Sequence, residues 1–141
     1  MTDTLDELHA QVALAALAAN ANILHVYDAT VSNPTPDPPY VLVYTSINRP
    51  YGTNGAGNAL DSTSRTFVVR IKCKCAGLTA EAARVVAMQV RTSLLDLRPV
   101  IAGRVCGPMH ADADATPPER DDSTNRVVMV QDLDYVFTST G

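Results

Sequence analysis

The stretch RTFVVRIKCKCAG, Arg65 to Gly77, decides the fold, because its apolar and charged residues alternate with the period of a β-strand. One side of this alternation is apolar throughout: Phe67, Val69, Ile71, Cys73 and Cys75. The other side carries Arg70, Lys72 and Lys74. The pattern therefore predicts a strand over Arg65–Cys75 whose cysteines face the core and whose basic residues face outward.

The strand continues through Ala76 and Gly77 into a predicted helix. Thr79 is a suitable N-cap, and Glu81 places negative charge in the first turn, where it is favourable. An apolar stripe follows at helical spacing: Ala83, Val86, Val90, Leu94 and Leu97. We expect Pro99 to end the helix.

Three arginines of this helix, Arg84, Arg91 and Arg98, are spaced seven apart and are therefore predicted to line one outer face. Such a row is commonly a solvated helix face. It can also contact another macromolecule, and of the possible contacts we favour salt bridges to an acidic neighbour within an assembly.

The N-terminal part predicts a helix followed by two strands. A Thr4–Glu7 capping box opens a helix over about Leu5–Ala19. A strand over Ile23–Val31 comes next, then a proline-rich extended connector, then a second strand over Tyr40–Ile47. The strand at Arg65 is the third.

Two long polar segments are predicted as extended arms, at about 48–64 and 111–126. Loops of this length in compact domains are usually functional or disordered. We expect interface residues in both arms: Arg49, Tyr51, Asn54, Asn58, Glu119, Asp121 and Asp122. The outward-facing Arg70, Lys72 and Lys74 and the helix residues Arg84 and Arg91 complete the predicted protein interface.

The chain closes with two predicted strands, Cys106–Ala111 and Val127–Thr138. Alternation in the last strand is imperfect, and either a bulge near Asp132 or burial of both faces at its start would explain this. The elements run helix, three strands, helix, two strands. This order predicts a single α+β domain over residues 1–141 with about five strands.

Composition excludes several classes of protein. The net charge of −4 argues against sequence-independent binding to nucleic acid, which needs a basic surface. No apolar run reaches the roughly 20 residues of a membrane-spanning helix. The first residues carry acidic groups and no Lys or Arg, so we expect no signal peptide and a cytosolic start. An odd number of cysteines fits reduced thiols.

No catalytic, cofactor or metal site is predicted. The C-x-C pair could be a metal or redox site, but both side chains point the same way from a strand, which favours the core. His9, His25 and His110 lie on different elements and accompany no local catalytic signature. The glycines of GTNGAGN lack the Lys-Ser/Thr ending of a phosphate loop. The aspartates of the second arm lack EF-hand spacing.

This order of elements resembles the tail terminator proteins of long-tailed, siphovirus-type bacteriophages. Four segments carry the resemblance: DELHAQVALAAL, YVLVYTS, RTFVVRIKCKCAG with the helix TAEAARVVAMQVRTSLLDL, and RVVMVQDLDYVF. The resemblance covers nearly the whole chain as a pattern of elements, since no short fingerprint carries it.

The resemblance implies an α+β fold with a curved, mostly antiparallel sheet, and a structural virion protein that forms a ring, usually a hexamer, at the end of the tail tube. The expected partners are further copies of the chain, the tail tube protein and a head-completion or neck protein, with DNA passing through the lumen without specific binding. It implies no catalytic residues. Alternatives are another head–tail connector, neck or minor tail protein, or a small cytosolic ligand-binding α+β domain.

Overall fold

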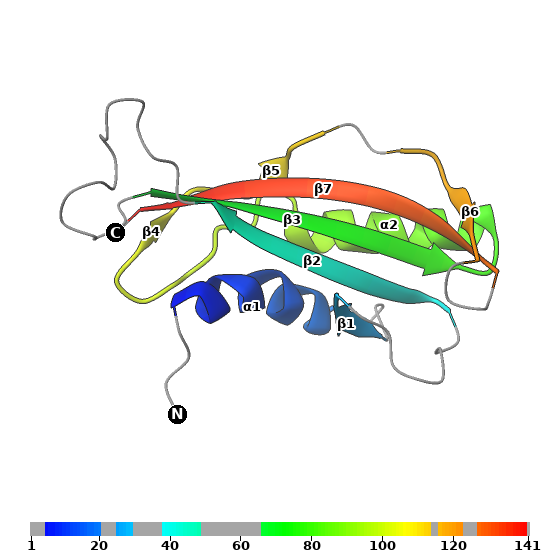
Figure 1. Ribbon diagram of the computed structural model, residues 1–141, viewed down its shortest axis with the longest axis horizontal. Helices are drawn as coiled ribbons and strands as arrows, with labels where there is room; N and C mark the ends of the chain where they lie inside the picture. The colour runs from blue at the N-terminus through cyan, green and yellow to red at the C-terminus, as the bar shows by residue number, and fades with distance from the viewer. Residues whose placement is uncertain are drawn as a thin grey trace.

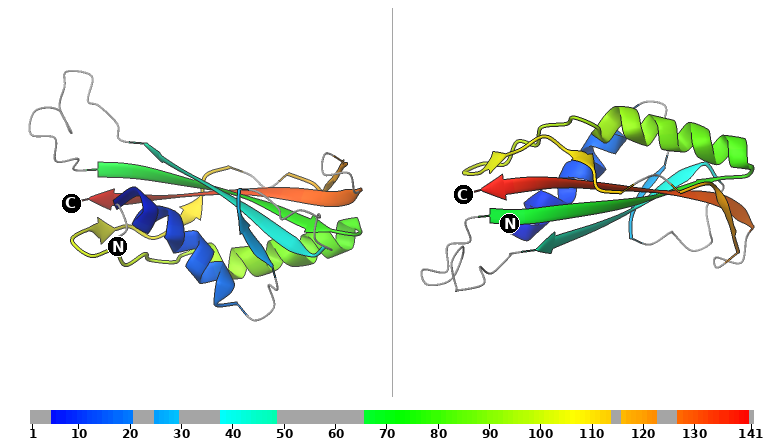
Figure 2. Two further views of the ribbon diagram at one scale, coloured as in Figure 1. Left: turned by 60° about the horizontal axis from the view of Figure 1, so that its bottom comes forward. Right: turned by 90° about the horizontal axis from the view of Figure 1, so that it is seen from above.

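The computed structural model describes residues 5–20, 25–29, 38–48, 66–113, 116–122 and 127–140. These residues form an α+β fold, as predicted, in which a twisted, curved sheet carries both described helices on one face (Figures 1 and 2). The elements are α1 (Leu5–Ala18), β1 (Val26–Asp28), β2 (Tyr40–Asn48), β3 (Thr66–Gly77), α2 (Ala80–Leu94), β4 (Val105–Cys106), β5 (His110–Ala111), β6 (Glu119–Asp121) and β7 (Val128–Thr140).

The strand β3 lies at the centre of the sheet. It pairs antiparallel with β2 on one side and with β7 on the other, over almost its whole length. The sheet order is β1-β2-β3-β7-β4, and β5 and β6 also pair with β7. The strand β1 is shorter than the predicted Ile23–Val31 in the described residues, and it pairs parallel to β2.

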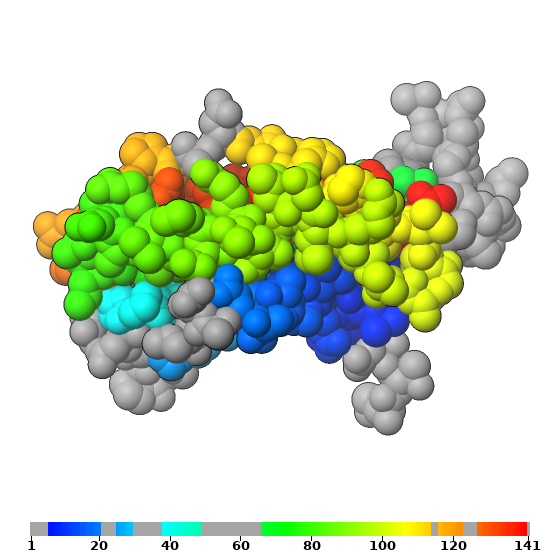
Figure 3. Space-filling view, turned by 180° about the vertical axis from the view of Figure 1, so that it is seen from behind, coloured from blue at the N-terminus to red at the C-terminus, as the bar shows by residue number. Residues whose placement is uncertain are grey.

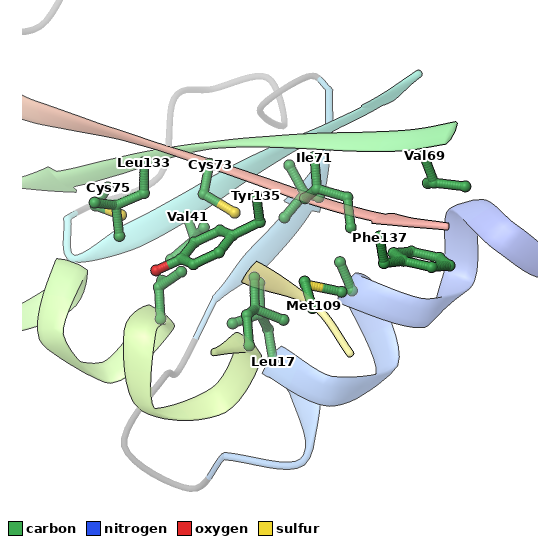
Figure 4. Close-up of a cluster of buried hydrophobic side chains, with 14 of the residues drawn as sticks. Leu17, Val41, Val69, Ile71, Cys73, Cys75, Met109, Leu133, Tyr135 and Phe137 are labelled. Carbon is green, nitrogen blue, oxygen red and sulfur yellow. The ribbon is translucent and has the colours of Figure 1, made fainter. Parts of the chain in front are cut away.

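The core lies between the helices and the apolar face of β3. Cys73 sits opposite Val43 on β2 and Leu133 on β7, and all three side chains are buried. Figure 4 shows Cys73 and Cys75 among the other inward-facing side chains of the sheet. The prediction that the cysteines belong to the core is confirmed, because both are free thiols buried in the main hydrophobic cluster.

The edge of β7 that faces away from β3 is covered by the chain that follows α2. In place of the single strand predicted over Cys106–Ala111, β4 and β5 pair with β7 separately. Pro108 lies between them and has no N–H to donate, while the Met109 N–H turns aside to the carbonyl of Leu97 at 2.7 Å. The second predicted arm also contains β6, which pairs with Val128–Val130, so this part of it lies along the sheet.

The predicted bulge near Asp132 is wrong. The pairing of β3 with β7 runs without interruption from Thr66 opposite Thr140 to Gly77 opposite Met129. The other explanation fits better, because Val128 is buried on the outer face of the sheet in a second cluster and Met129, on the opposite face, is half-buried. This second, smaller cluster contains Tyr40, Leu42, Ala76 and Val128, with Tyr27 and Val130 against it.

Helix α2 begins as predicted and ends earlier. The Thr79 Oγ1 accepts from the Ala82 N–H at 3.1 Å, which is an N-cap. The helix stops at Leu94, five residues before Pro99, because Asp96 adopts a left-handed φ of 64° and donates its N–H to the carbonyl of Met109.

The turn from β3 into α2 requires glycine at position 77. An added Cβ on Gly77 would lie 2.6 Å from the Ala83 nitrogen.

Candidate assembly surfaces

The basic residues of β3 point away from the helices, as predicted, and β7 brings acidic residues to the same face. In the register of the two strands, Lys72 lies opposite Asp134 and Lys74 opposite Asp132. The Lys72 Nζ also lies 3.9 Å from the Asp132 Oδ2 on the diagonal. Our sequence analysis did not identify these aspartates. The sequence contained the information, because Leu133 and Tyr135 alternate with Asp132 and Asp134 and so place the two aspartates on the opposite face of the strand.

Arg70 extends this charged row, since its Nε donates to the Asp112 Oδ2 at 3.2 Å. Both ion pairs are partly exposed, so each contributes at most about 1 kcal/mol to the free energy of unfolding. A hollow of about 330 Å³ lies along the row. The outer face of β3 is therefore neutralised by carboxylates of the same chain, and its charge does not require a neighbour.

The three arginines predicted for one helix face have three different environments. Arg84 is exposed on α2. Arg91 lies on the same helix, is exposed, and lines a hollow together with Tyr135. Burial raises the pKa of Tyr135, and Arg91 opposes that rise. Arg98 lies beyond the end of the helix, where it donates to the carbonyl of Cys106 at 3.2 Å. The predicted row of three is therefore wrong at Arg98.

A second hollow, of about 240 Å³, opens between the end of α2 and β5. It joins the exposed helix surface to the edge of the sheet, and Tyr135 and Leu133 from β7 contribute to its lining. The helix side contributes Arg91 and Leu95. The lining therefore combines buried side chains of β7 with two charged residues, Arg91 and Asp134.

The outward side of α2 carries apolar residues that the sequence analysis did not identify. Val85 and Met88 are exposed on the helix, with Leu78 before it and Leu95 immediately after it. The signal was present in the sequence, because spacings of 7, 3 and 7 residues from Leu78 to Leu95 place these residues along one side of a helix. The prediction used only the apolar stripe that packs on the core, so it missed this second, exposed row of apolar residues.

The acidic residues predicted for the second arm lie at the edge of the sheet. Glu119 and Asp121 belong to β6, and Asp122 follows directly. Glu119 and Asp122 are exposed. Pairing with β7 therefore holds this acidic segment in a defined place.

The candidate residues of the first arm, Arg49, Tyr51, Asn54 and Asn58, lie outside the described residues.

A serine and a histidine meet in the core, away from all the surfaces above. The His9 Nε2 lies 2.8 Å from the Ser139 Oγ, and both residues are fully buried. The Arg104 Nε donates to the same Oγ at 2.9 Å, and its guanidinium lies 4.1 Å from the centre of the Phe67 ring. A substrate has no access to this pair, and the arrangement ties α1 to the end of β7.

The thiols are chemically protected by burial. Burial raises the pKa of Cys73 to about 12, and it raises the pKa of Cys75 as well. A neutral thiol is a poor metal ligand and a poor nucleophile. Within the described ranges, no group of three or more His, Cys, Asp or Glu residues is placed to hold a metal ion. None of the described helices has the length and apolar character to span a membrane.

Comparison with known proteins supports the fold. No protein-family model matches the chain, and no curated protein matches it. A solved structure described as "Virion of native gene transfer agent (GTA) particle" contains a chain with a TM-score of 0.72 to this protein and 16% sequence identity. The match covers 99% of this chain and 100% of that chain. At this level of identity, the likeness establishes a shared fold.

Proposed function

We propose that the chain is a tail terminator, a structural virion protein of a long-tailed phage or phage-like particle. In this proposal its copies form a ring, a hexamer, that caps the tail tube and ends tube polymerisation. The ring also provides the surface that joins the tail to a head-completion or neck protein. The observation that carries the proposal is the full-length likeness in fold to a chain of a virion particle.

The surfaces of the chain support an assembly role. A ring forms when one patch of each copy binds a different patch of the next and the rotation closes. Exposed apolar residues on α2 and an acidic segment at β6 are two such different patches.

The charge of the chain suits the proposed position at the junction of tail and head. DNA passes through the lumen of such a ring. A net charge of −4 gives no general attraction to the phosphate backbone, so DNA can slide without being retained. The proposed location is therefore the virion, reached by assembly in the host cytoplasm.

A second candidate is another head–tail connector, neck or minor tail protein. The likeness favours it too, because the matching chain belongs to a whole virion particle, and a tail tube is only one part of such a particle. The two candidates differ in the partner to which the ring binds first. A terminator binds tail tubes in the absence of heads, and a connector binds heads in the absence of tails.

Particle mass and imaging test the proposal. Purified chain is mixed with tail tubes, or with DNA-filled heads that lack tails, and each mixture is analysed by light scattering and negative-stain imaging. The terminator proposal expects rings at tube ends. Binding to heads alone would favour the connector. Monomers that bind neither particle would contradict both.

A further inference from the structure

We infer that the outward side of α2 is one half of the contact between subunits, and that the acidic segment Glu119–Asp122 of the next copy is the other half. The α2 face is defined by Leu78, Val85, Met88 and Leu95 with Arg84 and Arg91 beside them. This inference rests on the proposed function and deepens it by naming the surfaces that build the ring.

The α2 face is apolar where the helix should meet water. Exposure reaches 61% for Leu78, 47% for Val85, 56% for Met88 and 41% for Leu95. Figure 3 shows α2 running along the surface of the molecule on the face opposite to the viewer of Figure 1. Exposed apolar residues that stand singly need no explanation, but a row along one side of a helix marks a contact surface.

The rim of this face is basic. Arg84 and Met88 are one helical turn apart, and Arg91 lies a further turn along. Arg91 and Leu95 also line the hollow of about 240 Å³ beside β5, which extends the face toward the sheet edge. Within α2, the two arginines outnumber the single carboxylate of Glu81, which is exposed on the same side of the helix as Val85, and Asp134 of β7 also lines the hollow. The surface that covers this face should therefore be acidic.

A second α2 helix does not fit as the occupant. Pairing of the same face on two copies gives a closed dimer, which leaves no surface for a third copy. A ring requires the α2 face to meet a different part of the neighbour. The basic rim also places two arginines against two arginines in part of such a dimer, which is unfavourable.

The segment Glu119–Asp122 is the best match among the described acidic groups. It contains three carboxylates and one Arg120, and Glu119 and Asp122 are exposed. The exposed Glu119 and Asp122 differ in place from Asp132 and Asp134, which face the basic residues of β3 in the register of the sheet. The strand β6 pairs with β7 in the sheet, which gives the segment a defined position before assembly.

Charge reversal and rescue test the contact. The assembly concentration of the full-length chain is measured for Arg84→Glu, for Met88→Glu and for the double variant Glu119→Arg/Asp122→Arg. Each should raise the half-assembly concentration by about tenfold or more, because each leaves like charges or a desolvated carboxylate in the contact. Combining Arg84→Glu with Glu119→Arg/Asp122→Arg restores opposite charges and should recover most of the loss.

Three controls separate the possible failures. Ser46→Glu adds a charge at an exposed position of β2 and should leave assembly unchanged, and circular dichroism with thermal melting confirms that each variant folds. Wild-type chain that never assembles, with or without tail tubes, overturns the proposed function together with this inference. Wild-type rings that tolerate Arg84→Glu and Met88→Glu overturn this inference and leave the proposed function standing.

The rescue identifies the occupant. If the α2 variants block assembly and the charge swap does not restore it, the segment Glu119–Asp122 is not the partner. Rescue of Arg84→Glu by Asp6→Arg/Glu7→Arg would place the start of α1 against the α2 face and would also overturn the inference as stated.

Discussion

At the scale of single residues, the buried cysteines give the protein a distinct response to alkaline pH. Burial raises the pKa of Cys73 from the ordinary 9.0 to about 12, and Cys75 shifts in the same direction for the same reason. The unfolded chain therefore loses these protons at lower pH than the folded chain does. Their contribution to stability is complete below about pH 9 and decreases as the pH rises toward 12.

We predict that the free energy of unfolding falls with a slope of up to about 1.4 kcal/mol per pH unit for each thiol above pH 9. Urea unfolding followed by circular dichroism at pH 8 to 10 measures the slope. The variant Cys73→Ala/Cys75→Ala should have a shallower slope whatever its absolute stability. Equal slopes for the variant and the wild type would show that the thiols do not ionise on unfolding.

The Ser139 hydroxyl is the other residue-scale feature with a measurable consequence. It lies within hydrogen-bond distance of both His9 and Arg104 in the core. Removing it in Ser139→Ala leaves the buried His9 ring and the half-buried Arg104 side chain without that partner and should cost about 1–3 kcal/mol in the free energy of unfolding. Ser46→Ala, at an exposed position of β2, is the matched control and should change stability by less than about 0.5 kcal/mol. A similar small effect at both positions would refute the structural role.

At the scale of elements, the Thr79 cap gives a direct test of how α2 begins. Thr79→Ala removes the acceptor of the Ala82 N–H and should destabilise the protein by about 1 kcal/mol. Thr79→Ser keeps the hydroxyl and should retain most of that stability. Thermal melting of the two variants measures the difference. Equal melting temperatures would mean that the hydroxyl is not the source of the effect.

The beginning of α2 was predictable and its end was not, for physical reasons. A cap is encoded locally, by Thr79 and the residues that directly follow it. The end depends on Asp96, whose N–H donates to Met109 in a segment that returns from beyond β4. Pro99 alone predicts a later end of the helix. The hydrogen bond from Asp96 to Met109 ends the helix earlier, at Leu94.

Among the strands, too, some could be predicted from the sequence and others could not. The long alternation in β3 fixed which face is buried, and the cysteines followed from it without any tertiary information. The three short pieces along β7 could not be predicted in this way, because β4, β5 and β6 contain only two or three residues each. Such short strands are defined by their pairing with β7 and have no period of their own.

At the scale of the whole molecule, the candidate surfaces were predicted in part. Arg84, Arg91 and the acidic residues of β6 were identified from charge alone, and the apolar residues between the arginines were not. Arg70, Lys72 and Lys74 were correctly placed outside, but their acidic neighbours belong to the same chain. Which residues lie opposite one another on two neighbouring strands depends on the register of both strands. The sequence of one strand alone does not determine that register.

The central claim is that rings of this chain end the growth of the tail tube. The most direct measurement is the length distribution of tail tubes, imaged by negative stain as polymerisation proceeds with and without the full-length chain. The account predicts that added chain stops elongation and leaves a ring at one end of each tube. Tubes that grow to the same lengths with bare ends, at chain concentrations well above that of tube ends, would contradict it.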